Sequence, residues 1–122
     1  PSYYYGARLM AFPLETSQPF CVQATLGTGD ATQTLRAAIA GVTFVVTSVT
    51  VTILVSGAQA IYVGDSSGSK KALSIAASAT LHAQFVMQAA FGLELTIGEA
   101  LVIKPAAAGP SAHVVVEGWI KS

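Results

Sequence analysis

The stretch of residues 42–55, VTFVVTSVTVTILV, decides the fold class of this chain. Most of its residues are β-branched, a composition that favours strands. Apolar side chains alternate with Thr and Ser along it, first at even and then at odd positions: Val42, Phe44 and Val46, then Val49, Val51, Ile53 and Val55. This two-residue period is typical of a half-buried strand. The change of parity predicts a bulge or bend near Thr47 and Ser48, because one extra residue turns the later side chains to the opposite face.

The longer apolar run that contains this strand, residues 39–64, approaches the length of a membrane span, which needs about 20 predominantly apolar residues. Thr and Ser recur throughout the run, and β-branched residues dominate it. We therefore interpret it as a pair of strands, the second of them in QAIYVG at 59–64, and expect no membrane partner.

Other short segments on both sides share the period of a strand and are separated by Gly, Pro, Ser and Asp. They are FCVQATL (20–26), ALSIAA (72–77), ATLHAQFVM (79–87), ALVIKP (100–105) and AHVVVEGWI (112–120). Residues 93–96 are expected to pair with 100–105 as a hairpin through Gly98 and Glu99, whereas 32–41 fits either a short helix or a strand. About eight short strands with turns every 8–12 residues or so predict an all-β fold, an antiparallel sandwich or barrel.

The predicted domain organisation is an extended N-terminal arm over residues 1–19 followed by a β-sandwich over residues 20–122. The arm has no clear period and holds Pro1, Pro13 and Pro19, three of the five prolines. The side chains predicted to form the core of the sandwich include Phe44, Val46, Val51, Ile53, Leu81, Phe85, Leu101 and Ile103.

The composition indicates a protein that assembles with other protein. The chain has 122 residues, enough for one domain with one core, and 52% of them are hydrophobic while only 10% are charged. A typical globular chain has roughly 25% charged residues. A surface this poor in charge favours oligomerisation.

Charge and cysteine content exclude several classes of protein. The formal net charge is zero, which argues against a nucleic-acid partner. A single cysteine, Cys21, cannot form an intrachain disulfide, and the alternation around it predicts a small semi-buried hydrophobe rather than a reactive thiol. No secretory signal is visible at the start of the sequence, so we expect assembly in a reducing cytoplasm.

The segment GDSSGSKK, residues 64–71, resembles two functional motifs. A trypsin-like nucleophile needs a histidine and a buried carboxylate before the serine, but His82 and His113 both follow it. A phosphate-binding loop needs G-x-x-x-x-G-K-[ST] before a long helix, and neither the spacing nor a helix is present. We interpret the segment as a hairpin turn, with Asp65 and Gly68 supplying the turn chemistry and Lys70 and Lys71 solvated.

The remaining polar candidates do not form a catalytic or metal-binding set. His82 and His113 lack a Cys, Asp or Glu at a spacing that would complete a zinc site, so both are expected at the surface or an interface. Three isolated carboxylates are interpreted as solvated side chains rather than an acid and base pair for glycoside hydrolysis: Glu94, Glu99 and Glu117. Trp119 is interpreted as a core or interface anchor rather than a platform for binding a sugar. No enzyme activity, metal or cofactor is predicted.

The least ordinary feature is the cluster of aromatic and apolar residues in the arm. Such side chains on an extended segment are expected to dock on a partner. The predicted partner-binding residues are Tyr3, Tyr4, Tyr5, Leu9, Met10 and Phe12.

About two thirds of the chain resembles the small jelly-roll proteins that tailed bacteriophages carry on their virions. The family plan is an "LraAvaGk" lead, a Thr- and Val-rich strand, a "yDGssGt" hairpin, a "G-aL-l" strand and a final strand that ends near an aromatic residue. The matching positions are Leu35–Gly41, Val42–Val55, Tyr62–Ser69, Gly98–Ile103 and Val114–Trp119. The tyrosine-rich start has no counterpart in this plan.

The resemblance implies a β-sandwich of the jelly-roll type and a structural role on the virion, after assembly in the host cytoplasm. The expected function is to decorate or stabilise a bacteriophage capsid. The expected partners are other copies of the chain, in a trimer, and the major capsid protein or another virion protein. The alternative is a carbohydrate-binding jelly-roll module of a phage fibre or spike.

Overall fold

The computed structural model describes residues 17–29, 31–55, 60–75, 83–107 and 109–122, and in these residues all regular structure is β. The strands are β1 (Ser17–Leu26), β2 (Gln33–Arg36), β3 (Thr43–Val55), β4 (Ile61–Asp65), β5 (Lys71–Ile75), β6 (Gln84–Glu94), β7 (Leu101–Pro105) and β8 (Ser111–Lys121). The predicted all-β class is confirmed. In the described part of the chain, no helix is long and apolar enough to span a membrane.

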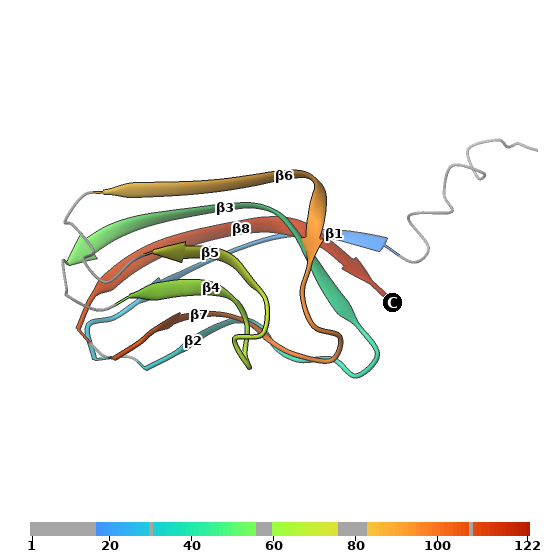
Figure 1. Cartoon of the computed structure of the whole chain (residues 1–122), viewed down its shortest axis with the longest axis horizontal. Helices are drawn as coiled ribbons and strands as arrows, with labels where there is room; N and C mark the ends of the chain where they lie inside the picture. Colours follow the sequence, from blue (N-terminus) through green and yellow to red (C-terminus); the bar gives the residue numbers. More distant parts are fainter. Residues whose placement is uncertain (1–16, 30, 56–59, 76–82, 108) are drawn as a thin grey trace, which may run out of the picture.

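The strands form two four-stranded sheets in the orders β1-β8-β3-β6 and β2-β7-β4-β5. All the pairings are antiparallel. The two sheets lie one over the other, with the four long strands in one layer and the short ones in the other (Figure 1). Eight strands in these two sheet orders make a jelly roll, so the predicted antiparallel sandwich of that type is confirmed.

Strand β3 contains the bulge that its sequence predicts. Its pairing with both β6 and β8 shifts register between Val46 and Ser48. Before the bulge the core-facing side chains include Phe44 and Val46, and after it Val49 and Val51. The extra residue thus keeps apolar side chains on the core face through the change of parity.

The core lies between the two sheets and contains most of the residues predicted for it. Phe44, Val46, Val51, Ile53, Leu101 and Ile103 are fully buried. Phe85 is only half-buried because it lies on β6, at the edge of its sheet, although it packs against the core. Leu81 lies outside the described residues.

One cation is part of the packing between the two sheets. The Arg36 guanidinium lies 5.3 Å from the centroid of the Phe20 ring and 5.8 Å from that of Phe44. The two rings meet edge to face with their centroids 6.0 Å apart. Because β1 and β2 belong to different sheets, this cation–π contact ties the layers together.

The structure corrects three expectations. Strand β1 begins at Ser17, inside the segment assigned to the arm, because Ser17 to Pro19 pair with the end of β8. Cys21 is exposed rather than semi-buried, because the alternation along β1 turns it away from the core. Residues 93–96 form no hairpin with β7: β6 and β7 lie in different sheets, and the intervening turn crosses between them.

Candidate partner-binding surfaces

The predicted partner-binding residues of the arm precede the described part of the chain. Tyr3, Tyr4, Tyr5, Leu9, Met10 and Phe12 all lie outside the described residues, and so does His82. The arm therefore stays a prediction, and the described surfaces are three: the β4–β5 hairpin, the outer face of the β2-β7-β4-β5 sheet and the outer face of the β1-β8-β3-β6 sheet.

The GDSSG segment is the turn of the β4–β5 hairpin, as the sequence predicts. Asp65 and Lys70 face each other across it, with the Asp65 amide donating to the Lys70 carbonyl at 3.0 Å. The Gly68 amide donates to the Asp65 carbonyl at 3.0 Å, and Gly68 has a φ of 78°, a left-handed conformation that favours glycine.

The Asp65 carboxylate has a larger role than turn formation, because it is fully buried and joins two turns. It accepts hydrogen bonds from the Thr96 hydroxyl at 2.6 Å and the Thr96 amide at 3.2 Å, and from the Lys70 amide at 3.1 Å. The Ser67 hydroxyl donates to its other oxygen at 3.1 Å. Thr96 lies in the turn between β6 and β7, so Asp65 fastens that turn to the hairpin.

Burial by itself would raise the pKa of Asp65, but the hydrogen bonds from Thr96, Lys70 and Ser67 outweigh it and hold this pKa below its ordinary value. The neighbouring Glu99 carboxylate accepts from the Ser67 amide at 2.7 Å and from the Ser66 hydroxyl at 3.2 Å. Both serines of the motif are thus bonded to carboxylates. The hairpin is a polar cluster that holds its own loops in place.

The other polar candidates are each placed by the sandwich in a separate setting. His113 on β8 hydrogen-bonds to the Thr25 hydroxyl at 3.1 Å and to the Gln23 amide oxygen at 3.2 Å, both on the neighbouring β1. Glu94 pairs with Lys121 at 2.9 Å, and the Glu117 side chain is exposed. No group of three or more His, Cys, Asp or Glu side chains among the described residues is arranged to hold a metal ion.

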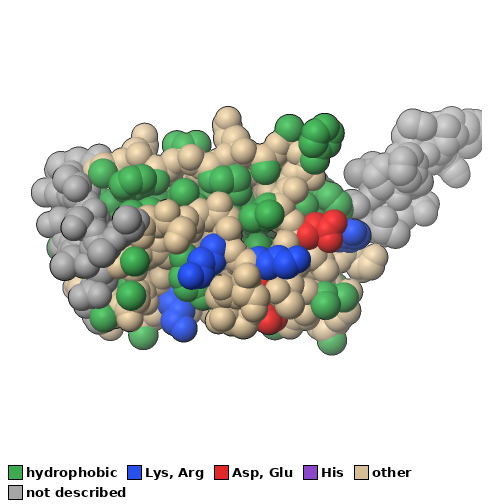
Figure 2. All heavy atoms as spheres, viewed as in Figure 1, with side chains coloured by type: hydrophobic (Ala, Val, Ile, Leu, Met, Phe, Trp, Pro, Cys, Tyr) green, Lys and Arg blue, Asp and Glu red, His purple; other side chains and the backbone are tan. Residues whose placement is uncertain are grey.

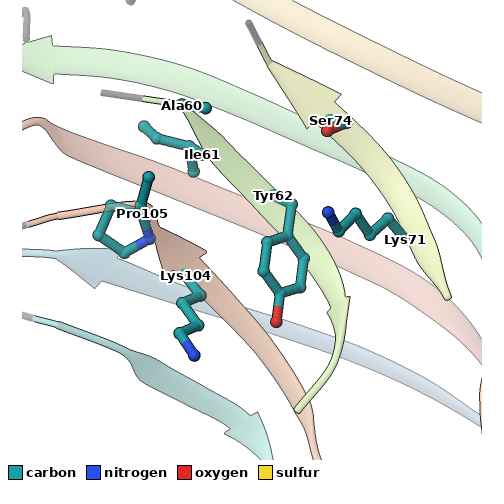
Figure 3. A pocket seen from close by; sticks show the side chains of 8 residues that line it. Ala60, Ile61, Tyr62, Lys71, Ser74, Lys104 and Pro105 are labelled. Atoms are coloured by element: carbon teal, nitrogen blue, oxygen red, sulfur yellow. The ribbon is translucent and has the colours of Figure 1, made fainter. Parts of the chain in front are cut away.

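The outer face of the β2-β7-β4-β5 sheet carries a pocket that the sequence does not predict. Tyr62 on β4 lies directly between Lys104 on β7 and Ser74 on β5 in the strand register. In Figure 3 the Tyr62 ring stands between the Lys104 and Lys71 side chains. The pocket has a volume of about 250 Å³ and is also lined by Ala60, Ile61, Pro105 and Ala106.

The Tyr62 ring is held in a fixed position in this pocket. Its hydroxyl donates to the Asp65 carbonyl at 3.1 Å, and the Lys71 ammonium lies 4.9 Å from the ring centroid, in cation–π contact. Burial raises the pKa of Tyr62, and the negative charges of Asp65 and Glu99 raise it further. Tyr62 is therefore a neutral phenol at physiological pH.

The outer face of the other sheet carries an exposed aromatic side chain on a bulge of β6. Between Val46 and Ser48 of β3 the β6 partner changes from Leu93 to Gln88, so residues 89–92 are left out of the ladder. Phe91 lies in this segment, and 95% of its surface is exposed. Gly92 next to it has a φ of 83° and packs against Val45, Thr47 and Trp119.

Trp119 is half-buried on β8, and together with Gly92 it lies against the outer side of β3. Nearby on this sheet is an open hollow of about 410 Å³, lined by Pro19, Phe20, Cys21, Thr47, Glu117 and Gly118. Thr47 borders both the hollow and the Gly92 bulge. This face therefore presents a projecting ring beside a shallow depression.

Comparisons with known proteins give a match at the level of structure. No family model matches the sequence, and no curated protein matches it. The chain is similar in structure to a chain in the acidic stable capsid structure of the Helicobacter pylori bacteriophage KHP30, with a TM-score of 0.59 and 14% sequence identity. The similarity covers 85% of this chain and 89% of that one, so the two share a fold over nearly their whole lengths.

Proposed function

We propose that this protein is a structural protein of a bacteriophage virion that decorates or stabilises the capsid through protein–protein contacts. The observation that carries the proposal is the similarity in fold, over 85% of this chain, to a chain of a phage capsid structure. The sequence resemblance to small jelly-roll virion proteins points to the same role. Neither the similarity in fold nor the resemblance in sequence involves a catalytic residue.

The surface of the sandwich supports a role in assembly. Several large apolar side chains of the described part are exposed to solvent, among them Phe91 at 95%, Ile97 at 62% and Val86 at 57%. Only 10% of the chain is charged. Exposed apolar groups on a surface with little charge are typical of contacts with other protein.

We further propose that the protein is a homotrimer and that the arm binds the major capsid protein or another virion protein. A closed cyclic oligomer would cover the apolar faces of the subunits. The arm residues Tyr3, Tyr4, Tyr5, Leu9, Met10 and Phe12 would then remain available to hold the oligomer on a shell.

Electron microscopy of labelled virions tests the proposed role. Antibodies to the purified protein, with gold-labelled secondary antibodies, are applied to virions of the phage or prophage that carries the gene. We expect labelling over the head. Labelling confined to the tail fibres, together with binding of the purified protein on a glycan array, would favour the alternative of a carbohydrate-binding module. Unlabelled virions would contradict both functions.

A further inference from the structure

The two lysines of the Tyr62 pocket have no acidic partner among the described residues. Each carboxylate that the structure describes is occupied or distant: Asp65 is buried in its own hydrogen bonds, Glu99 binds the hairpin serines, Glu94 pairs with Lys121 and Glu117 lies on the other sheet. In Figure 2, blue side chains of Lys or Arg lie across the middle of the visible face, and red side chains of Asp or Glu lie near some of them. Among the described residues, neither Lys71 nor Lys104 therefore forms an ion pair.

Side chains from three neighbouring strands form the pocket around the Tyr62 ring. Lys71 and Lys104 approach from different strands and flank the Tyr62 ring, which its hydroxyl hydrogen bond holds in place (Figure 3). Ser74 adds a hydroxyl donor opposite Tyr62. The remaining lining residues, Ala60, Ile61, Pro105 and Ala106, carry no charge.

We propose that this pocket binds the carboxylate of a glutamate or aspartate side chain in an acidic segment of a protein partner. The two ammonium groups supply charge complementarity to the carboxylate, and the uncharged lining residues would contact the short hydrocarbon stem that carries it. The proposal rests on the proposed function only for the identity of the partner, a virion protein. The binding chemistry stands on the pocket alone.

Size and ring access favour a protein side chain over a sugar or a nucleic acid. A volume of about 250 Å³ is below the roughly 300–1,000 Å³ of pockets that hold larger organic ligands. The Lys71 ammonium lies over the Tyr62 ring at 4.9 Å, where a sugar or a base would have to stack. A net charge of zero also gives nucleic acid little long-range attraction.

The test is an NMR titration of the isotope-labelled whole protein with a synthetic hexaglutamate peptide at 150 mM NaCl, with hexaglutamine as the neutral probe. We expect saturable shifts of the Tyr62, Lys71, Ser74 and Lys104 amides with hexaglutamate only. Lys71→Gln and Lys104→Gln should each weaken binding at least fivefold. Lys70→Gln is the matched control, because Lys70 is exposed on the same hairpin and does not line the pocket, and it should change affinity less than twofold.

Each other outcome counts against the proposal. Equal losses in Lys70→Gln and Lys104→Gln would show diffuse attraction rather than a site. Tighter binding of a uronic-acid oligosaccharide or of single-stranded DNA in the same titration would assign the pocket to another class of ligand. Because the titration uses the isolated protein, its result is independent of whether antibodies label virions.

Discussion

The buried Asp65 carboxylate fastens two turns of the sandwich together through its hydrogen bonds. Asp65→Asn keeps the shape but puts an amide group among the amide and hydroxyl donors of Lys70, Thr96 and Ser67. Losing charge-assisted hydrogen bonds at a buried site should lower the free energy of unfolding by about 2–3 kcal/mol at pH 7. Urea denaturation followed by circular dichroism measures it.

The pH dependence of this effect follows from the lowered pKa of Asp65. The stability that the ionised carboxylate contributes is fully present above the ordinary aspartate pKa of about 3.9 and is lost as the pH falls through the lower folded-state pKa. The gap between wild type and Asp65→Asn should therefore narrow at acid pH. An equal gap at pH 7 and pH 2.5 would show that shape rather than charge carries the effect.

The serines and lysine of the same hairpin should be dispensable for attachment to virions, which Ser66→Ala, Ser67→Ala and Lys70→Ala should leave unaltered. Ser66→Ala and Lys70→Ala remove exposed groups, so we expect changes of about 1 kcal/mol or less in stability. Ser67→Ala also removes a hydrogen bond to the Asp65 carboxylate and should cost about 1.5 kcal/mol. Co-sedimentation of the variants with particles is the measurement. Loss of attachment, or loss of a hydrolytic activity present in the wild type, would show that the hairpin is more than a turn.

At the scale of the elements, the two-residue period of the sequence predicts the strands. The β6 bulge and the link between the turns depend on contacts between residues that are distant in sequence. The change of apolar parity within 42–55 predicts the β3 bulge, because the whole pattern lies in one strand. The β6 bulge has no such signal, since AAFG at 89–92 lacks polar alternation. The sequence predicts Asp65 only as a turn residue. Its partner Thr96 lies 31 residues away, and the two come together only in the folded sandwich.

The β6 bulge depends on Gly92. Its positive φ, and the closeness of Val45 to the position that a Cβ would occupy, both disfavour a side chain there. Gly92→Ala should lower stability by about 1–3 kcal/mol, measured as a shift in the urea midpoint. Gly98→Ala is an informative comparison, because Gly98 shares the positive φ (79°) but has open space around it, and it should cost less. Equal costs would leave only backbone strain as the cause.

Phe91, the ring that this bulge presents, should matter for assembly and little for stability. With 95% of its surface exposed, Phe91→Ser should change the free energy of unfolding by about 0.5 kcal/mol or less. If the ring is buried in a subunit contact, the same variant should shift the oligomer toward monomers in light scattering. Ile97→Ser, at another exposed apolar residue in the β6–β7 turn, shows whether the effect is specific to Phe91. An unchanged oligomer for Phe91→Ser would place the subunit contact elsewhere.

At the scale of the whole molecule, the sequence predicts the class of fold more securely than the path of the chain. Strand period and turn residues predict a sandwich, yet the hairpin expected between 93–96 and 100–105 is wrong, because β6 and β7 belong to different sheets of the jelly roll. The Tyr62 pocket has a related origin. Its lysines come from β5 and β7, which are brought together only by β4 between them.

Attachment to the shell should depend on the arm. Tyr3, Tyr4, Tyr5, Leu9, Met10 and Phe12 give it an aromatic and apolar character that is suited to docking. Burying each such side chain contributes on the order of 1.5–3 kcal/mol before the cost of ordering, so several together would hold a subunit in place. Deletion of residues 1–12 removes this set and leaves every paired strand intact, since β1 begins at Ser17.

We therefore expect the truncated protein to keep the circular dichroism and the oligomeric state of the full chain and to lose co-sedimentation with particles. Replacing only Tyr3, Tyr4 and Tyr5 by serine separates the aromatic contacts from the length of the arm, and it should weaken attachment without abolishing it. Truncated protein that still co-sediments at wild-type occupancy would exclude the arm as the anchor. Attachment would then have to come from the surfaces of the sandwich itself, where the Phe91 bulge and the Tyr62 pocket are the two candidates to test next.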